Sequence, residues 1–275
     1  MNRPRLVALM YHDVEEAQVA SGFQVPSARA YRLPLPQFLS HIEAIQKGPL
    51  QPRSVFDLAS GGDRHGLLLT FDDGGASAVR IADILDGKGW KGHFFVTTSL
   101  IGTSGFVTRS NILDLYRRGH VVGSHSHTHP NICYNLTDEQ MFAEWRTSCL
   151  ELASILGIPI IVASVPGGDM NRRTVVMAAK AGIEYLFTSE ITRSPWQSAG
   201  ITCFGRVCIM RDDPLIAFER LIRFKGYGMR RAIRMSKQLV KKLIGGVYRS
   251  RMPVNYSPST PAPQQCPSGG EQTPQ

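Results

Sequence analysis

The chain has 275 residues, of which 31 are lysine or arginine and 22 are aspartate or glutamate, so its formal net charge is +9. It is 43% hydrophobic with a mean hydropathy of −0.11, which excludes an intrinsically disordered chain. No run approaches the roughly 18 apolar residues that a spanning helix needs, which excludes a polytopic membrane protein. A chain of this length can bury a sizeable core as one large α/β domain or two small ones.

The N-terminal segment contains a short apolar run that Tyr11, His12 and Asp13 interrupt, and no small-residue cleavage site follows. We therefore expect a first strand over 6–10 rather than a signal peptide, and a cytoplasmic location. Residues 15–35 show little periodicity and are interpreted as a loop over one end of the domain.

Short apolar runs then alternate with helical patterns. Further candidate strands cover 67–71, 92–97, 120–123, 160–164, 185–188 and 207–210, and candidate helices cover 36–47, 76–88, 109–118, 137–156, 171–182 and 212–224. Continuous apolar strands without polar alternation are typical of burial on both faces. The rhythm predicts a parallel sheet or barrel, in which reactive groups gather beyond the carboxyl ends of the strands.

Two adjacent carboxylates, Asp72 and Asp73, directly follow the strand predicted over 67–71. Neighbouring side chains of an extended chain point in different directions, so one carboxylate can bind a metal while the other faces a substrate water. The alternative is ordinary turn chemistry, because Asp-Gly sequences are common in turns.

Three of the eight histidines, His125, His127 and His129, fall within five residues at the end of another apolar strand. Neutral imidazole is the commonest metal ligand in proteins. A His-x-x-x-His pair with one carboxylate leaves coordination positions open, as a catalytic metal site requires. The five cysteines are irregularly spaced without a CxxC pair, and indicate neither a disulfide framework nor a structural zinc site.

The positive charge is confined to the C-terminal end. From Glu219 to Gln275 there are 11 basic and two acidic residues, which accounts for the whole net charge. Residues 229–248 combine apolar helical spacing with a basic face, and the chain after Pro253 is rich in Pro, Ser, Thr and Gln, as in a disordered tail. The helix can lie on an anionic membrane surface or simply dock on the domain, and we expect no nucleic-acid partner because no binding motif accompanies it.

Together, the TFDDG segment (Thr70–Gly74) and the HSHTH segment (His125–His129) resemble the polysaccharide deacetylase family, carbohydrate esterase family 4, with its NodB homology domain. The resemblance extends from the MYHDV segment (Met10–Val14) to about residue 211. The SVPGG and LFTSE stretches are similar to those of exopolysaccharide-associated bacterial members. The resemblance implies an irregular (β/α)7 barrel over 1–225. The basic helix, expected over 226–251, and the disordered tail, expected over 252–275, lie outside the resemblance.

The resemblance also implies a metal-dependent hydrolase that removes N-acetyl groups from amino sugars of a polysaccharide or lipid-linked glycan. Asp73, His125 and His129 would bind one divalent ion, Zn²⁺ or a similar ion such as Co²⁺, Ni²⁺ or Mn²⁺. Asp72 would be the general base that activates a metal-bound water. Ser126 and Thr128 would fix the loop by hydrogen bonds. Such an enzyme would work in the cytoplasm, at the inner face of the membrane.

Two later motifs depart from the family pattern. Ser164 stands where an arginine normally orients the base, and no histidine follows His129 to serve as general acid. His12, His127 and Arg206 are the candidates to fill that gap, with Arg206 expected to bind an oxyanion or an anionic sugar. The alternatives are hydrogen-bonded core histidines and a surface ion pair for Arg206.

Three functions therefore remain open. The first is a glycan N-deacetylase, the second a small-molecule amidohydrolase of the same fold, and the third a non-catalytic glycan-binding relative. The lost arginine and histidine favour the third, whereas the complete ligand set favours the first two.

Overall fold

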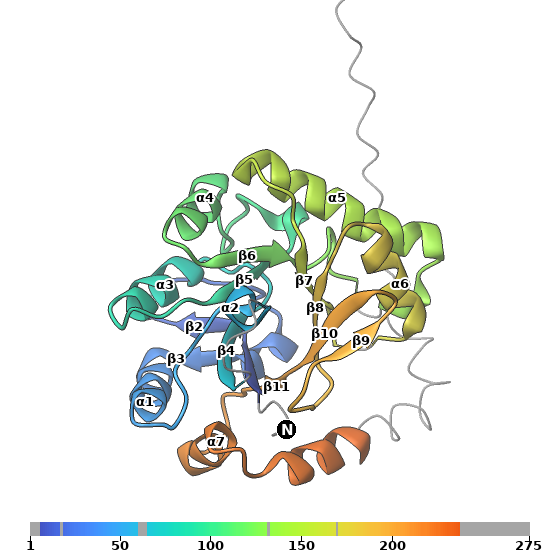
Figure 1. Cartoon of the computed structure of the whole chain (residues 1–275). Helices are drawn as coiled ribbons and strands as arrows, with labels where there is room; N and C mark the ends of the chain where they lie inside the picture. Colours follow the sequence, from blue (N-terminus) through green and yellow to red (C-terminus); the bar gives the residue numbers. More distant parts are fainter. Residues whose placement is uncertain (1–5, 17–18, 60–64, 131–132, 169, 237–275) are drawn as a thin grey trace, which may run out of the picture.

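The computed structural model describes residues 6–16, 19–59, 65–130, 133–168 and 170–236. Nine strands form one sheet in the order β11-β1-β4-β5-β6-β7-β8-β10-β9, and its pairs are parallel except for β10 with β9 (Figure 1). The strands are β1 (Leu6–Tyr11), β4 (Gly66–Phe71), β5 (His93–Val96), β6 (Val121–Ser124), β7 (Val162–Ser164), β8 (Tyr185–Thr188), β9 (Trp196–Ser198), β10 (Ile201–Gly205) and β11 (Val207–Cys208).

The sheet curls into a barrel because one chain segment pairs at both ends of the strand order. β10 pairs with β8, and β11, separated from β10 only by Arg206, pairs with β1. The segment 201–208 thus occupies the seventh position of a (β/α)7 barrel, and the predicted fold class is confirmed. β10 was not predicted, because Thr202 and Gly205 interrupt its apolar character, and the last strand was predicted too late, over 207–210.

Helices surround the barrel in Figure 1. Those predicted from periodicity all form, within three residues at either end, as α1 (Leu35–Gln46), α3 (Ala78–Asp86), α4 (Arg109–Arg117), α5 (Asp138–Leu156), α6 (Arg172–Lys180) and α7 (Leu215–Ile222). Helices α4, α5 and α6 begin with reciprocal capping boxes at Thr108, Thr137 and Asn171, which satisfy backbone N–H groups of the first turn.

The alternation of strand side chains divides the core in two. Every second strand residue points outward and packs against the helices, as Val7, Leu9, Leu67 and Leu69 do. The others fill the barrel interior, and these are Leu6, Ala8, Leu68, Phe95, Val121, Val162, Phe187 and Phe204. Thr70 follows Leu68 on the same inward register, so Asp72 comes next toward the carboxyl end of the barrel.

The interpretation of residues 15–35 as a loop is wrong in part. β2 (Asp13–Glu15) pairs in parallel with β3 (Arg32–Pro34), and a 3₁₀ helix, η1 (Pro26–Tyr31), precedes β3. A second small helix, α2 (Val55–Ala59), and the short 3₁₀ helices η2 (Thr98–Leu100) and η3 (Cys133–Asn135) were also not predicted. Such short elements depend on tertiary contacts rather than on periodicity.

The first part of the predicted basic helix is helical, from Tyr227 to Ser236. The rest of that helix and the predicted disordered tail lie outside the described residues. No helix in the described part of the chain is both long and apolar enough to cross a bilayer.

Candidate metal and catalytic site

The two adjacent aspartates lie just beyond the carboxyl end of β4 and point to different partners, as predicted. The Asp72 amide donates a hydrogen bond to the Tyr11 carbonyl (3.0 Å), which continues the β1–β4 ladder by one residue. Asp73 then turns into the left-handed region (φ 75°). This turn separates the two carboxylates, so that Asp72 faces Arg206 and Asp73 faces two histidines.

Asp72 forms a bidentate ion pair with Arg206, with Nη1–Oδ1 at 2.7 Å and Nη2–Oδ2 at 2.8 Å. The other donors of the guanidinium reach Thr70 Oγ1 (3.0 Å), Ser164 Oγ (3.2 Å) and the Thr188 carbonyl (3.2 Å). The guanidinium thus uses all of its donors. It also lies over the Phe95 and Phe187 rings that end the apolar interior.

The two roles considered for Arg206 in the sequence analysis are wrong in this structure. The side chain is 1% exposed, so it is not a surface ion pair. It has no spare donor for an oxyanion or an anionic sugar, because Asp72, Thr70, Ser164 and Thr188 occupy all of them. Instead, Arg206 positions Asp72. Ser164, which stands where the family pattern has an arginine, accepts a hydrogen bond from the Arg206 guanidinium.

This pair determines the charge of the predicted base. Burial by itself would raise the pKa of Asp72, but the Arg206 guanidinium and its hydrogen bonds, together with His125, hold that pKa below its ordinary value. Asp72 is therefore a carboxylate at neutral pH. Its Oδ2 atom lies 3.9 Å from His125 Nε2, at the edge of the Asp73–histidine cluster.

Asp73, His125 and His129 form the predicted three-donor cluster. Asp73 Oδ1 lies 3.3 Å from His125 Nε2 and 3.4 Å from His129 Nε2, and the three ligand atoms lie within 4.8 Å of one another. Donors bound at about 2.1 Å to one tetrahedral Zn²⁺ are about 3.4 Å apart. Asp73 Oδ1 is buried and makes no hydrogen bond to a described residue. The three residues therefore fit a divalent cation.

The His125 ring is held with its Nε2 atom toward the cluster. Its Nδ1 lies 3.1 Å from the Ser164 carbonyl and 2.8 Å from Ser164 Oγ. With an Nδ1 proton donated to the Ser164 carbonyl, Nε2 presents a lone pair. This is the tautomer that a metal ligand requires.

The histidine loop is held mainly by Glu144 of α5, which the sequence analysis did not identify. The Glu144 carboxylate accepts from the amides of His127 (2.9 Å) and Thr128 (2.8 Å) and from Thr128 Oγ1 (2.6 Å). Ser126 Oγ accepts from the His129 amide (3.1 Å), so the predicted roles of Ser126 and Thr128 are confirmed. The one sequence signal for this role is the helical position of Glu144, which places a charged residue on the side that carries Met141 and Trp145.

Backbone strain also gathers in this region. Among the described residues, five that are not glycine have positive φ, and three of them are Asp73, Ser126 (63°) and His129 (56°). His127 turns away from the cluster, and its Nδ1 lies 2.9 Å from Thr98 Oγ1. Strain of this kind persists only where surrounding bonds over-determine the conformation, which Glu144 and Ser126 do here.

A second buried carboxylate, Asp13, ties the N-terminal region to the turn after β4. It accepts from the hydroxyls of Ser21 and Ser77, and a Cβ atom on Gly22 or Gly75 would collide with it. Burial, partly offset by the two serine hydrogen bonds, raises the pKa of Asp13 to about 6. The sequence analysis quoted Asp13 only as part of a motif, without a role.

His12 and Phe23 border the site from the N-terminal side. His12 follows Tyr11, the register partner of Phe71, so it lies beside Asp72 at the barrel rim. Its ring is half-buried and packs against Tyr31 (4.8 Å between centroids), and its Nδ1 has no hydrogen-bond partner among the described residues. Burial lowers the pKa of His12, against the opposing effect of Asp73 and Asp72. The Phe23 ring packs against His129 (5.2 Å).

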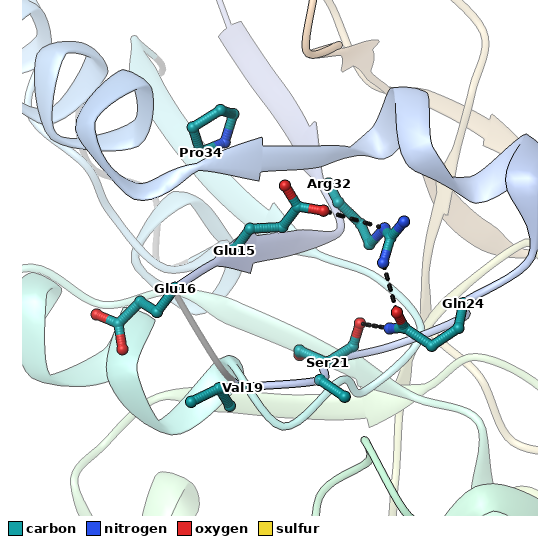
Figure 2. A pocket seen from close by; sticks show the side chains of 8 residues that line it. Glu15, Glu16, Val19, Ser21, Gln24, Arg32 and Pro34 are labelled. Carbon is teal, nitrogen blue, oxygen red and sulfur yellow. Dashed lines mark hydrogen bonds and ion pairs between the residues drawn. The ribbon is translucent and has the colours of Figure 1, made fainter.

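A cavity of about 490 Å³ lies nearby but is separate from the cluster (Figure 2). Glu15, Ser21, Gln24 and Arg32 contribute its polar groups, and Figure 2 shows Arg32 between Glu15 and Gln24. These groups contact one another: Arg32 Nη1 donates a hydrogen bond to Gln24 Oε1 (2.6 Å), and Arg32 Nε forms an ion pair with Glu15 Oε1 (3.5 Å). None of the predicted metal ligands or catalytic candidates lines this cavity.

Comparisons with known proteins show what this chain is similar to. Residues 60–186 match the family model described as polysaccharide deacetylase, a range that contains Asp72, Asp73, His125 and His129. Nothing among the curated proteins matches the chain.

Solved structures share the fold. They include a polysaccharide deacetylase from Bacillus cereus (17% identity, 79% of this chain and 69% of that one, TM-score 0.67). They also include the Streptococcus pyogenes deacetylase PplD in complex with acetate (19%, 80% and 99%, 0.66) and IcaB from Ammonifex degensii (18%, 80% and 97%, 0.64). The predicted resemblance is confirmed, whereas His12 and Arg206 lie outside the matched residues.

Proposed function

We propose that this chain, whose residues 60–186 belong to the polysaccharide deacetylase family, is a metal-dependent hydrolase that removes N-acetyl groups from amino-sugar glycans. The observation that carries the proposal is the placement of an ionised, arginine-held Asp72 beside the three-donor cluster of Asp73, His125 and His129. The cluster alone would suit a binding protein, but the adjacent base is an arrangement for hydrolysis.

The three donors of the cluster would hold one divalent cation, and they leave coordination positions open for substrate and water. When bound, such a cation supplies Lewis acidity toward an acetamide carbonyl and lowers the pKa of a coordinated water. One carboxylate oxygen and two neutral imidazole nitrogens can bind Zn²⁺ and also Co²⁺, Ni²⁺ and Mn²⁺.

Asp72 would take the proton of the attacking water. Although both of its oxygens accept from Arg206, each carboxylate oxygen has a second lone pair, so the base can still receive that proton. Arg206 keeps Asp72 ionised before the reaction and fixes its direction. In the absence of a histidine after His129, the same carboxyl can deliver the proton to the leaving amine.

His12 is the other candidate donor to that amine, because it lies beside Asp72 at the end of β1. A His12→Gln variant separates the two routes. If His12 donates the proton, kcat falls with KM nearly unchanged, and the alkaline limb of the pH profile disappears. If Asp72 serves both steps, kcat and the pH profile are retained.

The test of the function is acetate release from N-acetylglucosamine oligomers by the Zn²⁺-reconstituted protein. His125→Ala should lose both bound zinc and activity. His127→Ala is the matched control, because His127 lies in the same loop but outside the cluster. Ammonia release from small amides without acetate release would favour an amidohydrolase. Stoichiometric zinc with no turnover of either substrate class would favour the non-catalytic glycan-binding protein.

A further inference from the structure

The helix 227–236 docks on the barrel with its charged side inward. Arg230 bonds the Cys208 carbonyl (3.1 Å) and pairs with Asp213 (2.9 Å). Arg234, one turn later, bonds the Gly168 carbonyl (3.2 Å) and pairs with Glu190 (3.1 Å). Tyr227, on the same side, is buried. The inner face of this helix is thus made by one aromatic and two arginine side chains.

The outer side carries apolar side chains. Met229 is 62% exposed and Ile233 is 48% exposed, and at four residues apart they share one helical face. Met235, at the flank, is 60% exposed, and the preceding α7 adds Ile216, which is 64% exposed. A helix that merely covers its domain buries its apolar side and solvates its charged side. Here the arrangement is reversed, which points to an apolar partner outside the described residues.

Basic residues accompany these apolar side chains in the sequence. Residues 215–236 contain six basic residues and one acidic residue, Glu219. With Arg230 and Arg234 committed to the barrel, the remaining four, Arg220, Arg223, Lys225 and Arg231, are exposed. In the part of the chain that the structure describes, none of these four forms an ion pair. We call these exposed side chains of residues 215–236, namely Ile216, Met229, Ile233, Met235 and the four bases, the outer surface.

We propose that the outer surface docks on an anionic lipid bilayer. Apolar side chains enter the boundary between headgroups and acyl chains, and basic side chains gain from anionic headgroups. A second copy of the chain would bring the same four positive charges into contact. Nucleic acid would meet Met229 and Ile233 without any stacking aromatic on this surface. Only the bilayer satisfies both the apolar and the basic groups.

The docking would place the carboxyl end of the barrel near the lipid. The inner arginines contact Cys208, Gly168 and Glu190, which lie at or beyond the carboxyl ends of β11, β7 and β8. The metal cluster follows β4 and β6 at the same end of the barrel. Figure 1 shows the helix running below β10 and β11, on the side opposite α5. If the proposed function holds, a membrane-linked glycan is the substrate class that this placement favours.

The experiment is co-sedimentation of the full chain with vesicles of equal parts phosphatidylglycerol and phosphatidylcholine, and with vesicles of phosphatidylcholine alone. We expect binding to the anionic vesicles that weakens with salt, and little binding to the neutral ones. Ile233→Asp should weaken partition about ten-fold or more, since it removes an apolar contact and adds a repelled charge. Leu150→Asp, on α5 and 52% exposed, makes the same change elsewhere and should bind as wild type.

Equal binding by Ile233→Asp and the wild type would overturn the proposal, and so would equal binding to both vesicle types. Sedimentation velocity without lipid would identify a second copy as the partner, if the wild type dimerised and Ile233→Asp did not. Acetate release from soluble oligomers should be unchanged in Ile233→Asp. Vesicle binding without any hydrolysis would contradict the proposed function alone.

Discussion

At the scale of single residues, the site depends on the arginine that positions Asp72. The bidentate pair between Asp72 and Arg206 needs a planar fork, which lysine lacks. Arg206→Lys keeps the buried positive charge but leaves Asp72 with one contact, so we expect kcat to fall about 10–100-fold with metal content and KM little changed. Steady-state kinetics and elemental analysis check this. Arg211→Lys, at the Glu15 ion pair, is the control, and equal losses in both variants would contradict the positioning role.

Glu144 acts on the metal donors through the backbone. Its carboxylate receives three hydrogen bonds from His127 and Thr128, between the two histidine ligands. Glu144→Gln turns one acceptor into a donor facing N–H groups, so we expect zinc affinity to fall about 10–100-fold, measured by competition with a chelator. Glu151→Gln, on the same helix and 3.7 Å from His127, should leave the affinity unchanged. An unaltered affinity in Glu144→Gln would show that the loop keeps its shape without this clamp.

At the scale of elements, periodicity predicted the parts of the fold that are long or uniformly apolar. Strands such as β4 and helices such as α5 can be predicted from the local sequence. A strand that is buried on both faces is a continuous apolar run, and a helix that is buried along one side has apolar residues at helical spacing. β10 and the β2–β3 pair could not be predicted in this way, because their pairing partners are far away in sequence. The metal donors were predicted for the same local reason, since each motif directly follows a strand.

The role of Arg206 was not predictable in this way. Its contact with Asp72 joins residues 134 positions apart and exists only because β10 and β11 close the barrel. Ser164 stands where the family pattern has an arginine, and the guanidinium that contacts Ser164 comes from Arg206, between β10 and β11. A local motif cannot report which element fills a shared interior volume.

Asp13 joins three elements, namely β2, the segment that contains Ser21, and the start of α3 at Ser77. Its pKa is raised to about 6 by burial, so the folded protein binds a proton more tightly than the unfolded chain. The contribution of Asp13 to stability is therefore present below about pH 4 and is lost as the pH rises to about 6. Asp13→Asn should remove this dependence, measured as the change in unfolding free energy between pH 5 and pH 7. A wild-type slope retained in the variant would contradict this assignment.

At the scale of the whole molecule, buried histidines change the stability with pH in the opposite direction to Asp13. His41, His93 and His120 are all buried, and burial lowers the pKa of each to about 4. The unfolded chain takes up their protons near pH 6.5, while the folded protein excludes them. Together, the shifts of these three histidines are larger than the opposite shift of Asp13. We therefore expect net destabilisation as the pH falls from about 6.5 to about 4.

His93 gives the sharpest test of this balance because both of its nitrogens are committed. Nε2 accepts from the Val55 amide (2.9 Å) and Nδ1 donates to the Leu69 carbonyl (2.9 Å), so a second proton would face an N–H group. From pH 7 to pH 5, the wild type should lose up to about 2 kcal/mol of unfolding free energy more than His93→Gln, which does not titrate. Urea unfolding at both pH values measures the difference. An equal loss in His93→Gln and the wild type would mean that this histidine is not what makes the fold sensitive to acid.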